Sequence, residues 1–300
     1  MPMRQTTQGT SKAVIFCSTA ILVFGSSFEP AQPIKDELRV MTFNIPYHEP
    51  GFKIGSWAAR KEMVAGTVRF LKADLAGFQE VVKEQITDLE ALLPEYAWLG
   101  VGRDDGKAAG EFNPLFYLKK RFRILKGATF WLSETPSLPG KKGWDAAYPR
   151  IVTWARLEDL SRGETFHIFN THFDNMGETA RMESARLLLR MIREIAGGGP
   201  VIVTGDFNFN EKDSNYRILT SETAERPGLA DTRRLSVAPP YGSNHTFNVF
   251  SQNVAAGARI DFIFVRNTGP VLRYSVISDK WDGRFVSDHN AVAADILVRK

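Results

Sequence analysis

The pattern of apolar and polar positions predicts both strands and helices, and the clearest pattern lies at 201–210. A β-branched apolar run is followed there by a polar cluster that includes Asp206 and Asn208. Such a run is typical of a buried strand, and polar residues just after a buried strand often bind ligands. If the strand continues, Asp206 and Asn208 share one face, while Phe207 and Phe209 share the other. An Asx-type turn is the alternative interpretation.

The rest of the chain predicts an α+β fold. Strands are expected at 38–45, 74–78, 96–101, 115–118, 122–131, 151–157, 165–170, 258–265, 271–278 and 290–298. Helical spacing of apolar residues predicts helices at 57–71, 86–93 and 177–196 and a partly helical segment at 212–225. Strands outnumber helices and short loops join several of them, which favours mixed, largely antiparallel sheets over a doubly wound parallel sheet.

The first 27 residues are expected to be a signal peptide. Arg4 and Lys12 accompany an apolar stretch at 13–25, which is short for a membrane span. A retained membrane anchor is the alternative. The single cysteine, Cys17, lies in this segment, so the mature chain would have no thiolate or disulfide chemistry. We expect a linker at 28–37, one domain at 38–300, secretion or periplasmic localisation, and no transmembrane domain in the mature chain.

The charge balance says little about a polyanionic partner. The formal net charge is +4, and the first 27 residues contribute two basic residues and no acidic residue. Binding along a nucleic acid depends on many contacts between basic side chains and phosphates. Nucleic acid is therefore a weakly supported partner, and we expect a monomer.

Side chains with catalytic chemistry recur at the predicted strand ends: Asn44, Glu80, Glu111, Arg150, His172, Asp206, Asn208, Asp261, Asp288 and His289. Taken singly, each has an ordinary explanation, because such residues cap turns or face solvent. Their recurrence at corresponding points is harder to explain in this way. Glu80, Asn44 and Asp288 offer the hard oxygen ligands that suit Mg²⁺, with Mn²⁺ as an alternative.

The remaining residue types fit hydrolysis of a phosphoester. His289 with Asp261 as its carboxylate partner suits a general base that activates water. Arg150 and His172 suit stabilisation of charge on phosphoryl oxygens. Trp144, in the long loop before Arg150, is a candidate for stacking on the substrate. The combination indicates metal-assisted hydrolysis.

The ordered motifs resemble those of the endonuclease/exonuclease/phosphatase superfamily, which includes deoxyribonuclease I and abasic-site endonucleases. From residue 38 to the C-terminus they are MTFNI, FQE, GEFNPLFY, PRIVTW, NTHFD, GDFN, RIDFIF and SDH. The segments FWLSETP and GWDAAYPRIVTWARL are most similar to a bacterial, often secreted branch. The resemblance implies a four-layer αββα sandwich of two packed mixed, mainly antiparallel sheets flanked by helices, with the site at one end of the sheets.

The resemblance also implies roles for individual residues. Glu80 would be the principal metal ligand with Asn44 and Asp288 nearby, and His289 would be the base oriented by Asp261.

Further roles follow from the same resemblance. Asp206 would position the nucleophile, assist the leaving group or bind a second metal, and Asn208 would hold the phosphate. Arg150 and His172 would contact phosphate oxygens. Glu111 and Tyr117 would belong to the supporting shell of the site. The chain departs from the family pattern at two positions: Pro46 stands where relatives carry a basic residue, and Asn175 stands where they often carry histidine.

The sequence thus predicts a metal-dependent hydrolase that cleaves a phosphoester, either as a phosphodiesterase or as a phosphatase. A catalytically silent binding module on the same fold is one alternative, and a nuclease acting on extracellular DNA or RNA is another. The joint presence of the predicted ligands, base and phosphate contacts argues against the silent module.

Overall fold

The computed structural model describes residues 1–3, 37–47, 56–221, 228–248 and 258–298. Nearly all of the predicted signal peptide and linker falls outside these residues. Within them, the structure contains no helix with the length and apolar character needed to cross a membrane.

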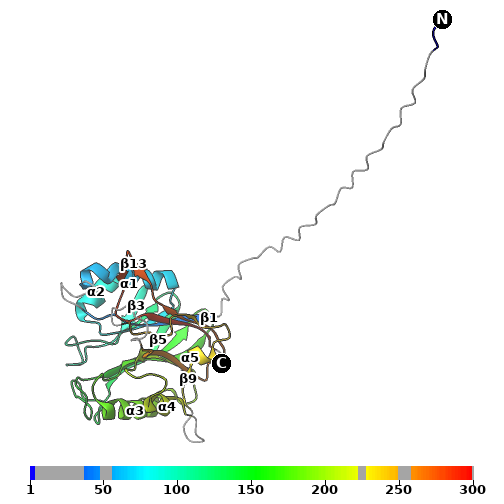
Figure 1. The fold of residues 1–300 in the computed structure, drawn as a ribbon. Coiled ribbons are helices and arrows are strands. Elements are labelled where there is room, and N and C mark those ends of the chain that lie inside the picture. Colours follow the sequence, from blue (N-terminus) through cyan, green and yellow to red (C-terminus); the bar gives the residue numbers. More distant parts are fainter. Residues whose placement is uncertain (4–36, 48–55, 222–227, 249–257, 299–300) are drawn as a thin grey trace. The chain divides into compact units, whose positions relative to one another are not determined.

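Two β-sheets pack face to face between two layers of helices (Figure 1). The first sheet has seven strands in the order β10 (Tyr241–Gly242), β12 (Val271–Ile277), β15 (Ala291–Leu297), β1 (Glu37–Asn44), β2 (Leu75–Gln79), β4 (Leu115–Leu118) and β3 (Tyr96–Leu99). The second has six, in the order β5 (Phe122–Trp131), β6 (Ile151–Asp159), β7 (Glu164–His172), β8 (Val201–Asp206), β11 (Asp261–Arg266) and β9 (Ala230–Asp231). A separate hairpin joins β13 (Lys280–Trp281) to β14 (Arg284–Phe285).

Three clusters of buried apolar side chains fill the interfaces between the layers. The helices are α1 (Trp57–Leu71), α2 (Lys83–Leu92), α3 (Glu178–Ala196), α4 (Ser214–Thr220) and α5 (Thr232–Leu235). One cluster joins α1 and α2 to the first sheet, and a second joins α3 and α4 to the second sheet. The third lies between the sheets, where residues such as Val40 and Ile168 are fully buried. The predicted four-layer α+β sandwich is therefore confirmed.

The strand directions bring several chain segments to one edge of the sandwich. β1 and β2 are parallel, as are β7 and β8, so each pair ends together, with Asn44 opposite Gln79 and His172 opposite Asp206. The neighbouring strands β15 and β11 are antiparallel to these pairs and therefore begin at the same edge. The polar residues predicted at strand ends consequently converge, although the chain separates them widely.

Of the two interpretations of 201–210, a strand that continues and a strand that ends in a turn, the structure shows the second. β8 ends at Asp206, and Asn208 adopts a left-handed backbone conformation with φ of 51°. The Asn208 amide donates to Asp206 Oδ1 at 2.9 Å, which is the Asx-type turn considered as the alternative. Phe207 and Phe209 are nevertheless both buried in the cluster beneath α3 and α4.

Other element boundaries also differ from the predictions. The strand expected from residue 258 begins at Asp261, and a short strand, β10, lies in a region where no element was predicted. The helical segment expected at 212–225 forms a helix only at Ser214–Thr220, and part of the remainder lies outside the described residues. These are the places where short or polar segments take their conformation from their neighbours rather than from an apolar repeat.

A buried polar network joins the two sheets close to the strand ends. Gln79 Nε2 and Thr204 Oγ1 both donate to Asn170 Oδ1, at 2.7 and 3.0 Å, and Asn170 Nδ2 donates to the Phe78 carbonyl at 2.7 Å. A Cβ on Gly77 would lie 2.4 Å from Thr204 Oγ1, so only glycine permits this close approach of the sheets. The network holds the two halves of the site in register.

Candidate active site

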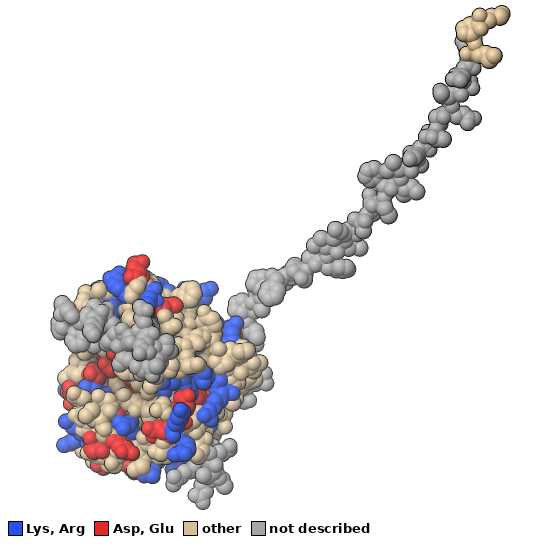
Figure 2. All heavy atoms as spheres, viewed as in Figure 1, with Lys and Arg blue, Asp and Glu red and all other residues tan. Residues whose placement is uncertain are grey.

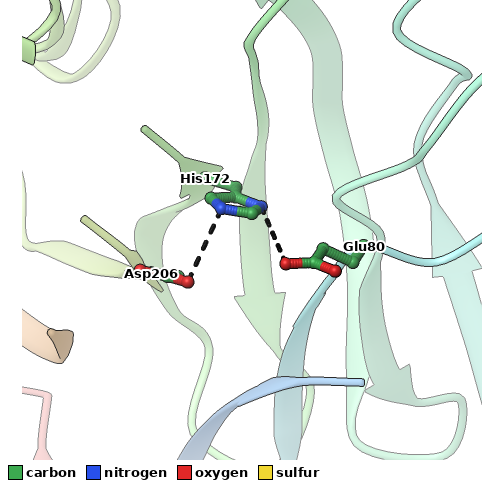
Figure 3. A group of neighbouring side chains, drawn as sticks. All are labelled: Glu80, His172 and Asp206. Atoms are coloured by element: carbon green, nitrogen blue, oxygen red, sulfur yellow. Dashed lines mark ion pairs between the residues drawn. The ribbon is translucent and has the colours of Figure 1, made fainter. Parts of the chain in front are cut away.

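The ends of four strands from both sheets meet in one cluster. Asn44 Nδ2 donates to Glu80 Oε1 at 2.9 Å and to Asp206 Oδ2 at 3.0 Å, so it bridges the sheets. Figure 3 shows the His172 ring between the carboxylates of Glu80 and Asp206. Its Nε2 lies 3.5 Å from Asp206 Oδ2, and its Nδ1 lies 4.0 Å from Glu80 Oε1. Sequence positions more than 150 residues apart therefore form one polar centre.

A second group adjoins the first through Asp206. His289 Nδ1 lies 2.8 Å from Asp261 Oδ2, within hydrogen-bonding distance, and His289 Nε2 lies 3.7 Å from Asp206 Oδ2. All three side chains are buried. Because Asp261 occupies Nδ1, the free nitrogen of His289 is the one on the side of Asp206. This geometry matches a histidine base held by a carboxylate.

Asn208 determines which nitrogen of His172 carries a proton. Asn208 Nδ2 donates to the Phe173 carbonyl at 2.9 Å, which orients the amide, and it lies 3.0 Å from His172 Nε2. An amide NH₂ can only donate, so His172 Nε2 accepts and the ring proton lies on Nδ1. The side chain of His172 is thus arranged as a neutral imidazole.

These residues surround a pocket of about 380 Å³, called the site pocket below. It is lined by Glu80, Arg103, Glu111, Tyr148, Arg150, His172, Asn175, Asp206, Asn208, Phe247, Ile260, Asp288 and His289. The predicted residues Asn44 and Asp261 do not line it, but each is hydrogen-bonded to a residue that does. Arg150 is held at the wall by Asp174 Oδ1 at 3.2 Å and Asn175 Oδ1 at 3.1 Å.

The structure does not bring two predicted substrate-binding residues to this pocket. Trp144 has a left-handed backbone (φ of 50°), and its amide donates to the Glu134 carboxylate. Its side chain therefore lines a different hollow of about 650 Å³ beside α3 and α4, called the arginine groove below. Tyr117 lies on β4 and packs against the cluster between the sheets.

Sequence reasoning missed four residues that line the site pocket: Arg103, Tyr148, Phe247 and Ile260. Tyr148 belongs to the same loop as Trp144, and the two guanidinium carbons of Arg103 and Arg150 lie 5.0 and 5.7 Å from its ring centre. Arg103 lies in the glycine-rich segment GRDDGKAAG, which sequence analysis would assign to a loop without predicting its path. The one available signal was an arginine within a short segment rich in turn-forming residues.

Burial and neighbouring charges alter the protonation of the site. Burial, followed by the charge of Glu111, raises the pKa of Glu80 to about 7. Burial, followed by Asp261, raises the pKa of Asp206 to about 6. Burial and then Arg150 lower the pKa of His172 well below its usual value. Burial opposes protonation of His289 too, but Asp261 and the other carboxylates outweigh it and raise that pKa well above its usual value.

The donor set fits a divalent cation. Asn44 Oδ1 is buried and has no hydrogen-bond partner among the residues that the structure describes. Ligand atoms of Glu80, His172 and Asp206 lie within 4.8 Å of one another. Four carboxylates line the pocket against two arginines; Asp206 is buried and the other three are half-buried, and such negative charge held partly out of water is costly without a cation. Carboxylate and amide oxygens suit Mg²⁺ or Mn²⁺.

The sequence matches the model of the Endonuclease/Exonuclease/phosphatase family over residues 41–289. The chain belongs to this family. The fold agrees with a family structure from Bacteroides vulgatus, with 39% identity, a TM-score of 0.83, and coverage of 88% of this chain and 100% of that one. It also agrees with the mannosyl-6-phosphatase of Bacteroides thetaiotaomicron, with 35% identity, a TM-score of 0.80, and coverage of 86% and 99%.

A more distant family relative is a probable RNA exonuclease of Schizosaccharomyces pombe. It is 24% identical over 204 residues, which cover 62% of this chain and 39% of that relative. The match thus spans well under half of the yeast protein. Family members are phosphoesterases and nucleases, so the chain is a hydrolase of that family.

Proposed function

We propose that this protein is a divalent-metal-dependent phosphoester hydrolase in which His289 activates water. The observation that carries this proposal is the position of His289 between Asp261, 2.8 Å from its Nδ1, and Asp206, 3.7 Å from its Nε2. Nδ1 is held by Asp261, so Nε2 is the atom that takes the proton from water. Asp206 lies where it can orient that water.

Glu80, Asn44 and Asp288 would hold the cation, with Mg²⁺ expected and Mn²⁺ as the alternative. Glu80 supplies a carboxylate and Asn44 supplies the buried amide oxygen that lacks a partner. When bound, such an ion would polarise the phosphoryl group and offset part of the carboxylate charge that keeps His289 protonated. The Arg150 guanidinium would contact the phosphoryl oxygens. Asn208 gives its two amide protons to the Phe173 carbonyl and to His172 Nε2, so it would orient His172 rather than hold the phosphate as the sequence suggested.

A small phosphomonoester, such as a sugar phosphate, is the substrate class that we favour. The 35% identity to a mannosyl-6-phosphatase over almost all of that chain supports this choice. The near balance of charge supports it too: the formal net charge is +4, and basic and acidic side chains are intermixed on the one face that Figure 2 shows. Hydrolysis of nucleic acid is the second candidate, on the evidence of the exonuclease relative.

The test is a comparison of substrates on protein stripped with EDTA and reloaded with Mg²⁺ or Mn²⁺. The panel contains p-nitrophenyl phosphate, bis-p-nitrophenyl phosphate, mannose 6-phosphate and plasmid DNA. We expect metal-dependent release of phosphate from the monoesters. Cleavage of DNA alone would move the protein to the nucleases, and full activity in excess EDTA would contradict the metal-dependent mechanism.

We also propose export through the N-terminal segment. Its basic residues and short apolar stretch support a signal peptide. Mass spectrometry of the protein expressed in a Gram-negative host should find a mature N-terminus near residue 28 in the periplasm. Recovery of the intact chain in the membrane fraction would support the retained anchor instead.

A further inference from the structure

Arg103 lies at the site pocket on a loop whose backbone is held by several internal hydrogen bonds. The Arg103 amide donates to the Glu111 carbonyl at 3.0 Å, and the Asp104 amide donates to the Ala109 carbonyl at 3.1 Å. Trp131 Nε1 donates to the Arg103 carbonyl at 2.7 Å. The position of Arg103 is therefore set before any ligand binds, which lowers the entropic cost of using its side chain in recognition.

The guanidinium of Arg103 keeps an unused donor. One terminal nitrogen pairs with Glu111, and the side chain is only 12% exposed. Arg103 Nε is buried without a hydrogen-bond partner among the described residues, and Asp104 Oδ1 at 3.9 Å is too far away to serve as one. A buried donor without a partner destabilises the protein. In a residue that lines a pocket, a bound ligand is the direct explanation.

Arg103 shares its aromatic neighbour with a second guanidinium. Arg103 and Arg150 both lie against the ring of Tyr148 and both line the site pocket. Burial lowers the pKa of Arg103, Glu111 opposes this shift, and the positive charge of Arg150 adds to it. The two guanidinium groups line one pocket of about 380 Å³ and repel each other. An anion that contacts both would offset this electrostatic repulsion.

We propose that Arg103 and Arg150 form a two-arginine clamp that binds the terminal oxygens of a phosphomonoester and selects it over a phosphodiester. The proposal rests on the phosphoester hydrolase activity proposed above. A monoester near pH 7 carries close to two negative charges and three free oxygens. A diester carries one charge and two free oxygens, and its second ester group would have to occupy space beside the clamp. Arg103 thus acts as a specificity-determining residue that touches the substrate.

The experiment compares Arg103→Ala and Arg103→Lys with wild type in the full-length, Mg²⁺-loaded protein. Lys107→Ala is the matched control, because Lys107 is an exposed cation in the same loop. For p-nitrophenyl phosphate we expect Arg103→Ala to lower kcat/KM by about 10- to 100-fold, mainly through KM, as expected for a charged hydrogen bond. For bis-p-nitrophenyl phosphate we expect a loss of less than about threefold. Arg103→Lys should fall between, since lysine keeps the charge but not the planar fork.

Equal losses on both esters would overturn the clamp, because they would make Arg103 a positioning residue that acts through Glu111 and Glu80. A loss of Mg²⁺ affinity in Arg103→Ala, measured by calorimetry, would lead to the same conclusion. If Arg103→Ala does not fold, Arg103→Lys tests the clamp through the same comparison, the loss of kcat/KM on the monoester relative to the loss on the diester.

The clamp and the hydrolase activity can fail separately. If wild type hydrolyses neither ester with any divalent metal, the proposed function fails, and binding of inorganic phosphate to the metal-loaded protein tests the clamp by itself. Phosphate affinity at least about tenfold weaker in Arg103→Ala than in Lys107→Ala supports the clamp. Equal affinity overturns it.

Discussion

The site pocket and the arginine groove differ in a way that shows what marks a functional site. The groove is larger, about 650 Å³ against 380 Å³, and its four arginines are all exposed. In the site pocket the charged groups are buried or half-buried, and Arg103 Nε and His172 Nδ1 have no hydrogen-bond partner among the described residues. Exposed charges are stabilised by water, whereas buried ones need a ligand or a partner. Burial of charge, and not volume, distinguishes the site pocket.

The largest effect should come from the base. Replacing His289 with alanine removes the atom proposed to accept the proton, and we expect kcat to fall by about 10²- to 10⁴-fold. The measurement is metal-saturated turnover of p-nitrophenyl phosphate, with circular dichroism to confirm folding. A folded His289→Ala protein with unchanged kcat would contradict the role of His289 as the base, and the site pocket would then no longer differ from the arginine groove in catalysis.

A weaker but still large effect is expected on metal binding. Glu80→Gln removes one negative charge at the predicted ligand while keeping its shape, so the Kd for Mg²⁺ should rise at least about tenfold. Titration calorimetry on the EDTA-stripped protein measures this. The control is Glu183→Gln in the arginine groove, for which we expect no change in the Kd. A similar rise in Kd in both variants would mean that the overall electrostatic potential of the protein, and not ligation by Glu80, determines the affinity.

Tyr148 and Trp144, two aromatic residues of one loop, should behave differently. Tyr148→Ala removes the ring against which Arg103 and Arg150 lie, and we expect kcat/KM to fall by about tenfold, in line with cation–π energies. Trp144→Ala should leave kcat/KM within about twofold and lower the free energy of unfolding by about 1–3 kcal/mol, because Trp144 packs against the core beneath α3. Urea denaturation alongside kinetics measures both. A raised KM in Trp144→Ala would restore the substrate-stacking role predicted from the sequence.

The smallest effect concerns a histidine outside both hollows. His167 lines a third hollow of about 600 Å³, and burial, followed by the charge of Arg156, lowers its pKa. His167 therefore binds a proton more readily in the unfolded chain than in the folded protein. The neutral His167 side chain contributes fully to the free energy of unfolding above about pH 6.5, and this contribution is lost as the pH falls through the lowered pKa of the folded state. The Tm measured by thermal unfolding should fall more steeply between pH 7.5 and pH 5 in wild type than in His167→Gln. Parallel declines in the two proteins would contradict the shift.

Segments with a strong apolar repeat were predictable from local sequence. The helix at Trp57–Leu71 and the strand at Leu115–Leu118 match the predicted bounds. Their apolar period is set by the geometry of a helix or a strand and does not depend on distant residues. The site residues at strand ends were found for a related reason, because Glu80 and Asp206 directly follow runs that had to be buried.

Segments without such a repeat were not predictable in the same way. The turn at Asn208, the placement of Trp144 away from the site pocket and the placement of Arg103 beside it depend on hydrogen bonds to other segments of the chain. A loop of polar and glycine residues has many conformations of similar energy, and long-range packing selects one. The sequence indicated that such loops are present but contained no local signal for their direction.

The sequence by itself determined the α+β class, most of the helices and strands and the chemical types gathered near the strand ends, because an apolar repeat has to be buried. The four-layer arrangement was expected only from the resemblance to the family. The sequence also carried the motifs that identify the family. Only the tertiary structure decided that Asn44 bridges Glu80 to Asp206 across the sheets and that Arg103 joins Arg150 at one wall. Those contacts form between segments far apart in the chain, so their geometry exists only once both sheets have packed.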